Sequence, residues 1–134
     1  MSDKSHIDYC NMGHLPIYFG FCDNKKAWRK EMRRMKIDDA DQMLLNNKPA
    51  TCWSFTRPNG YECIIVCIDK KSYKTQPVIA VIGLITHECS HAIDYIMQAI
   101  GERNPSTEFK AYTLQGLVQF CIDRIGVIDE QRAG

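Results

Sequence analysis

The longest apolar run of the chain, Val78 to Ile85, constrains the fold more than any other segment. The run is far shorter than the roughly 20 residues that a membrane-spanning helix needs. Pro77 suits the first turn of a helix, and the helical pattern continues beyond the run to about Met97 or Ile100. The segment therefore predicts one long, buried helix at the centre of a globular domain.

The composition is that of a single globular domain. Of the 134 residues, 45% are hydrophobic and 25% are charged, which does not suit a disordered or fibrous chain. The net charge is +1, so nothing indicates attraction to nucleic acid or to an anionic membrane. Residues 1–8 lack the apolar stretch of a secretory signal, and the 7 cysteines include no C-x-x-C pair. We expect a cytoplasmic protein with reduced thiols, and neither nucleic acid nor a membrane as its partner.

Other segments show strand and turn signals before the long helix. Aromatic and β-branched residues predict a strand over 15–21, and apolar residues at spacings of three and four predict a basic helix over 24–35. Two β-prone runs, 50–56 and 61–69, flank the turn sequence Arg57-Pro58-Asn59-Gly60 and predict a hairpin. The second run is continuously apolar, which suggests a strand covered on both faces.

The remaining segments complete one α+β domain over 1–134. A short helix is expected over 38–45, and 70–76 is expected to be a polar connection. A last helix should begin at Ser106 or Thr107, continue to about Arg124 and end at Gly126. Residues 1–14 are expected to form an irregular N-terminal arm.

The middle of the long helix contains His87-Glu88-Cys89-Ser90-His91, the pattern H-E-x-x-H. Four residues advance a helix by about 400°, so the two imidazoles lie about 40° apart on adjacent turns and can reach one ion. Imidazole nitrogens bind zinc, and a catalytic zinc site usually has three protein ligands. Glu88 lies beside the ligands, where it can act as a general base, and Cys89 is expected to pack. The alternative is a pair of hydrogen-bonded histidines with an incidental glutamate.

This motif and the order of elements resemble those of the zincin metallopeptidases. The resemblance covers about 15–124 and implies a small, mostly antiparallel sheet beside the motif helix, with a ligand on the following helix. It implies zinc-dependent hydrolysis of a protein or peptide substrate. Asp94 and Met97 stand where the extended metzincin pattern needs Gly and His, so that pattern is absent. The layout resembles ImmA/IrrE-type and other small phage or prophage proteases.

Zincins of the gluzincin type take their third ligand from the helix after the motif, and this resemblance points to Glu108. If the motif helix ends at Ile100, it extends about 14 Å beyond His91. The chain must then return through a non-helical segment that ends near Ser106, or the helix must end earlier. The alternative for Glu108 is an ordinary first-turn glutamate, favoured by the helix dipole.

Other residues compete for a place near the metal. Asp94 lies one turn beyond His91, and we interpret it as a partner that orients an imidazole. His6, Cys10 and His14 are spaced by four residues and could form another metal set or fold over the zinc, although an irregular N-terminal arm does not favour either.

The predicted catalytic residues are Glu88 and Tyr112. Tyr112 lies one turn after Glu108 on the same face of its helix, where the phenol could donate to an oxyanion or pack in the core. The predicted Zn²⁺ ligands are His87, His91 and Glu108. The strand over 61–69 is expected to lie nearest the site, and an edge strand could hold the substrate extended.

Two other classes of function stay open. A zincin-like fold could bind metal as an interaction or virion-associated module without proteolytic turnover, although the intact Glu88 favours an enzyme. The basic helix over 24–35 could bind nucleic acid, although a solvated face is the expectation. The natural substrate, the cleavage specificity and the oligomeric state are not specified by the sequence.

Overall fold

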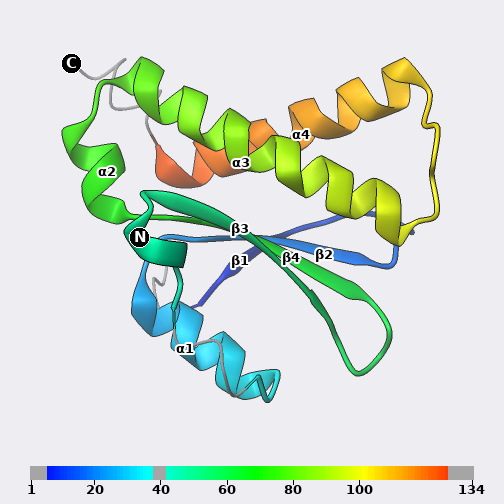
Figure 1. Ribbon diagram of the computed structural model, residues 1–134, viewed down its shortest axis with the longest axis horizontal. Coiled ribbons are helices and arrows are strands. Elements are labelled where there is room, and N and C mark those ends of the chain that lie inside the picture. The colour runs from blue at the N-terminus through cyan, green and yellow to red at the C-terminus, as the bar shows by residue number, and fades with distance from the viewer. Residues whose placement is uncertain (1–5, 38–41, 127–134) are drawn as a thin grey trace.

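The computed structural model describes residues 6–37 and 42–126, and every structural statement below refers to these residues. The expected α+β class is confirmed, with a small sheet between helices (Figure 1). The elements are β1 (Asp8–Cys10), β2 (Ile17–Cys22), α1 (Lys25–Arg34), the 3-10 helix η1 (Leu45–Asn47), β3 (Ala50–Thr56), β4 (Glu62–Ile68), α2 (Lys70–Thr75), α3 (Val78–Ala99) and α4 (Thr107–Ile125).

The sheet has four strands in the order β1-β2-β4-β3. The pairs β1–β2 and β3–β4 are antiparallel, whereas β2–β4 is parallel, so the sheet is mixed. The predicted hairpin is confirmed, and Gly60 takes the left-handed conformation at its turn, with φ 87°. Because β4 pairs on both sides, β3 is the edge strand next to it.

β4 is covered on both faces, as its continuous apolar sequence predicts. Ile64 and Val66 pack in the core that α3 and α4 share with the sheet. Cys63 and Ile65 point the other way, into a second core with Trp28 of α1. The helices α3 and α4 therefore cover one face of the sheet, and α1 covers the other (Figure 1).

Three predictions about the segments between the main elements need correction. Residues 8–10 of the expected irregular arm form β1, because they can pair with the edge of β2. The connection over 70–76 contains α2, which Asp69 caps by accepting from the Lys71 N–H at 3.1 Å. Of the helix expected over 38–45, residues 38–41 lie outside the described residues, and the chain that follows has only the single turn of η1.

The two long helices have nearly the predicted bounds. Ser106 caps α4 by accepting from the Phe109 N–H, and Gly126 ends it with φ 74°. The start of α3 is less buried than its apolar sequence predicts, since Ile79 is 81% exposed. No helix among the described residues has the length and apolarity to cross a lipid bilayer.

Candidate metal centre

His87 and His91 lie on adjacent turns of α3, and both side chains are exposed. Their Nε2 atoms are 3.3 Å apart, and their ring planes make an angle of 79°. The hydroxyls beside them are engaged with the helix itself, because Thr86 donates to the Ile82 carbonyl and Ser90 donates to the His87 carbonyl. The two imidazoles are therefore the groups that this face of α3 offers to a ligand.

The separation of the two imidazole nitrogens fits one zinc ion. Two nitrogens that each bind zinc at about 2.0–2.1 Å, at a tetrahedral angle, lie about 3.3–3.4 Å apart. The Nε2 atoms of His87 and His91 are separated by this distance. The same contact meets the criteria of a hydrogen bond between the two rings, which is the alternative interpretation of the motif, and an ion and that hydrogen bond would use the same nitrogens. These two residues fit zinc as half of a tetrahedral ligand set.

Glu88 lies on the sheet side of α3, although the two histidines of the motif are exposed. Its side chain is buried, with 7% of the residue exposed. No described residue donates a hydrogen bond to its carboxylate or forms an ion pair with it. Its carboxylate oxygens are nevertheless not enclosed, because the one enclosed polar side-chain atom without a hydrogen bond among the described residues is Arg57 Nε, so water can still reach and solvate the charge. Glu88 is thus turned away from the two histidines around α3, as its position in the motif predicts.

The electrostatics of the cysteines locate Glu88 further. Burial raises the pKa of the Cys52 thiol on β3, and the negative charge of Glu88 raises it more. Burial likewise raises the pKa of Cys67 on β4, with a smaller contribution from Glu88. The carboxylate therefore lies between α3 and the β3–β4 hairpin.

The prediction that the strand over 61–69 lies nearest the site is only partly correct. It corresponds to β4, which packs under α3 but pairs with a neighbour on each side. The strand with a free edge near Glu88 is β3, which sequence reasoning did not select. The continuous apolar run of β4 could have indicated this arrangement, because a strand covered on both faces lies inside a sheet. Its hairpin partner β3 is then the strand at the edge.

The chain returns from α3 to α4 without helix, as the ligand geometry required. The helix α3 ends at Ala99, Gly101 has φ 76°, and α4 begins after the cap Ser106. Glu108 is exposed in the first turn of α4. Among the described residues, no three His, Cys, Asp or Glu side chains come together as a metal set, so Glu108 is not joined to the two histidines.

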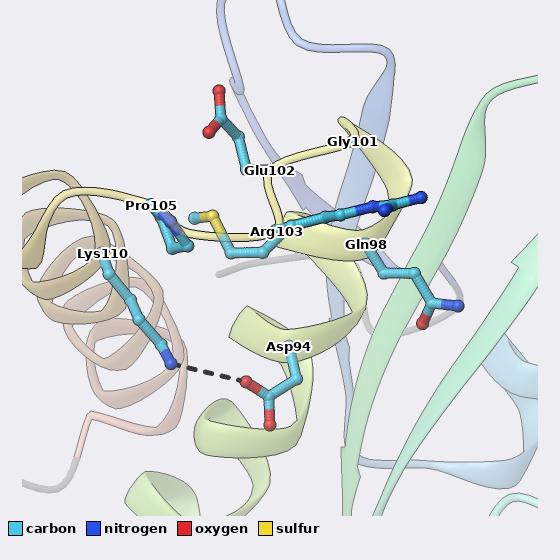
Figure 2. A pocket seen from close by; sticks show the side chains of 8 residues that line it. Asp94, Gln98, Gly101, Glu102, Arg103, Pro105 and Lys110 are labelled. Carbon is cyan, nitrogen blue, oxygen red and sulfur yellow. Dashed lines mark ion pairs between the residues drawn. The ribbon is translucent and has the colours of Figure 1, made fainter.

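A polar pocket of about 620 Å³ lies one turn beyond His91, between the end of α3 and the start of α4. Figure 2 shows Lys110 extending from α4 toward Asp94, with Nζ and Oδ1 3.7 Å apart, while Glu102 and Arg103 point away from this pair. Asp94 thus pairs with a lysine and not with an imidazole. Residues 108 and 110 are about 200° apart around a helix, so Glu108 is turned away from the side that faces Asp94.

The other predicted site residues are dispersed. Tyr112 is 68% exposed and does not pack in the core, and no described hydrogen bond or ring contact joins it to the motif. His6 lies near Lys30 of α1, with 3.5 Å between Nε2 and Nζ, and does not form a metal set with Cys10 and His14. Cys89 is fully buried and contacts Cys121 of α4 at 4.0 Å, which confirms its packing role.

All seven cysteines are free thiols in the structure. Comparison with known proteins adds no relative, because no family model, no curated protein and no solved structure matches the chain.

Proposed function

We propose that this protein is a zinc-dependent metallopeptidase of the zincin type, acting on a protein or peptide in the cytoplasm. The observation that carries the proposal is the 3.3 Å separation of the His87 and His91 Nε2 atoms, which suits two ligands of one tetrahedral ion. The buried Glu88 supports it, because an unpaired carboxylate beside such a pair has the chemistry of a general base.

The residues of the motif have separate roles in the proposed peptide hydrolysis. His87 and His91 would hold Zn²⁺, which when bound would supply Lewis acidity toward a peptide carbonyl and toward water. The Glu88 carboxylate takes a proton from the attacking water and then passes it to the nitrogen of the leaving amine. Burial on the sheet side of α3 limits the motion of this carboxylate.

The free edge of β3 offers a place for an extended substrate. An added peptide strand would receive main-chain hydrogen bonds from this edge, and β3 lies beside Glu88. The polar pocket beyond His91 is next along the same helix, since Asp94 follows His91 by about 4.5 Å of helix rise. A substrate side chain a residue or two from the cleaved bond would reach it.

Glu108 is our proposed third ligand, and Asp94 is its rival. Both carboxylates are exposed, and either requires a side-chain or helix adjustment to meet the histidine nitrogens. Zinc affinity of Glu108→Ala and Asp94→Ala, measured by competition with a chromophoric chelator, separates them. We expect a loss of at least about tenfold for Glu108→Ala and little change for Asp94→Ala. The reverse order would assign the ligand to Asp94.

The function is tested by zinc content and by cleavage of peptides together. The purified protein should contain one zinc per chain and cut members of a peptide mixture derived from a cellular proteome, read by mass spectrometry. His87→Ala should lose both properties, whereas His14→Ala, an exposed histidine away from the motif, should keep both. Zinc content unchanged by His87→Ala would overturn the proposal.

The described residues include no third ligand beside the two histidines, and this favours a second candidate function. A partner protein could complete the ion at the exposed histidines, which would make the protein a metal-binding interaction module without turnover. In that case zinc would promote association with the partner, no peptide would be cut, and Glu88→Gln would behave as wild type in both assays.

A further inference from the structure

A second pocket lies at the end of the sheet where the two parallel strands β2 and β4 finish. β2 and β4 are parallel neighbours, and their carboxyl ends lie side by side at Cys22 and Cys67. The chain leaves β2 for α1 on one face of the sheet and leaves β4 for α2 and α3, with α3 on the other face (Figure 1). A sheet opens a crevice where successive connections diverge in this way, and ligands of open α/β sheets bind there.

A pocket of about 550 Å³ occupies this crevice, between the turn before α1, the segment around η1 and the turn before α2. This volume lies within the range of sites for small organic ligands, roughly 300–1,000 Å³. It shares no lining residue with the histidine motif or with the pocket beyond His91. A ligand here would therefore be additional to a peptide substrate.

The described lining of the pocket is cationic. It carries four cationic side chains against two carboxylates, and the cationic ones are Lys25, Arg29, Lys48 and Lys71. None of these four forms an ion pair with a described residue. They come from three separate segments, so the charge is gathered by the fold and is not a run in the sequence.

The two carboxylates of the lining are engaged with the protein. Asp23 accepts from the Tyr73 hydroxyl at 2.6 Å and from the Asn24 amide at 3.1 Å. Asp69 accepts from the Lys71 backbone N–H as the cap of α2. Both carboxylates keep their charge, so the four cations and two carboxylates give the described lining a net charge of +2, which attracts an anion.

We propose that this pocket binds a small phosphorylated molecule. A guanidinium can hold two oxygens of one phosphate, and lysines at several sides suit a group with more than one negative charge. Among the described residues the lining includes Met43 and Leu44 but no aromatic ring, so this part of the site selects the phosphate and offers no stacking platform for a base. The pocket volume of about 550 Å³ suits a small molecule.

Binding of inorganic pyrophosphate, measured by isothermal titration calorimetry, tests the proposal. The titration uses metal-free protein carrying His87→Ala, so that pyrophosphate cannot bind through a metal at the motif. We expect Arg29→Gln and Lys71→Gln each to weaken binding by about tenfold or more. Arg33→Gln and Lys74→Gln are matched controls on the same helices, exposed and outside the pocket, and should change it by less than about twofold.

Three results would overturn the inference. The first is no binding of pyrophosphate by the parent protein, and the second is an equal loss in the control variants, which would indicate diffuse attraction. The third is equal affinity for citrate, which would show that the pocket selects charge and not phosphate. Tight binding of a short DNA duplex that Arg33→Gln also weakens would assign the basic helix to nucleic acid instead.

Discussion

Two glutamates on opposite faces of the sheet are equally buried but have different surroundings. Glu31 of α1 and Glu88 of α3 are each 7% exposed. Glu31 accepts from Arg34 at 2.5 and 3.0 Å, from Arg57 at 3.3 Å and from the Tyr9 hydroxyl. Glu88 has no partner of this kind among the described residues.

The contrast separates a structural charge from a charge available for chemistry. A buried carboxylate surrounded by donors is stabilised by them, and neutralising Glu31 would leave the largely buried Arg57 without its countercharge. A largely buried carboxylate that has no protein donors but still reaches solvent, as Glu88 does, stays open to a water molecule or a substrate. Each prediction below changes one side of this comparison while the other side serves as its control.

The largest effect is expected from Glu88→Gln. The amide keeps the shape of the side chain but cannot take a proton, so cleavage of peptides should fall by about 10²- to 10⁴-fold. Zinc content should not change, because the two imidazoles are untouched. Because the unpaired charge is removed, the free energy of unfolding at neutral pH should not fall. Full activity in this variant would exclude Glu88 as the base.

The matched change on the other face, Glu31→Gln, should act on stability alone. It removes a charge that Arg34 and Arg57 both contact, and we expect a loss of about 3 kcal/mol in the free energy of unfolding. Urea denaturation at neutral pH measures this loss. Zinc content and activity per folded molecule should equal those of wild type. If both variants lost the same stability, the distinction between the two glutamates would fail.

Lowering the pH should remove the contribution of the Glu31 charge to the free energy of unfolding. Burial by itself would raise the pKa of Glu31, but hydrogen bonds from Arg34 and Tyr9 and the charges of Arg34 and Arg57 outweigh it and lower the pKa. The folded pKa is thus below the unfolded value of about 4.3. The stabilisation is present above that unfolded value and is lost as the pH falls through the folded pKa.

The check on this sign is denaturation of wild type and Glu31→Gln from neutral pH down to about pH 3, across the unfolded pKa of a glutamate. The difference in unfolding free energy should shrink as the pH falls below about 4.3. A difference that stayed constant through this range would mean that the charge of Glu31 is not the source of the stabilisation.

The parts of the fold that depend on local pattern were predictable from the sequence. The motif helix was expected from Pro77 to Met97 or Ile100, and α3 is Val78–Ala99. The hairpin follows from its turn residues, and the cap Ser106 marks the start of α4. Each of these features is specified by residues within a few positions of one another.

Features that depend on distant contacts were not predictable in this way. The parallel pairing of β2 with β4 passes over α1 and β3, so no local signal marks it. No burial was predicted for Glu31, although it shares the apolar stripe with Trp28 and Met32, and that position was the available sign of burial. The angle at which α4 presents Glu108 is set by packing of α4 on α3, which the sequence spacing does not fix.

The smallest effect is expected at the exposed ion pair between Asp94 and Lys110. Their charged atoms are 3.7 Å apart, and the side chains are 72% and 47% exposed. Exposed pairs contribute about 0–1 kcal/mol, because water already solvates both charges. Lys110→Gln should therefore change the free energy of unfolding by no more than about 0.5 kcal/mol. An ion pair would then contribute much to stability at the buried Glu31 and little at the exposed Asp94, so burial decides the size of the contribution. A loss near that of Glu31→Gln would instead show that this pair holds α3 and α4 together.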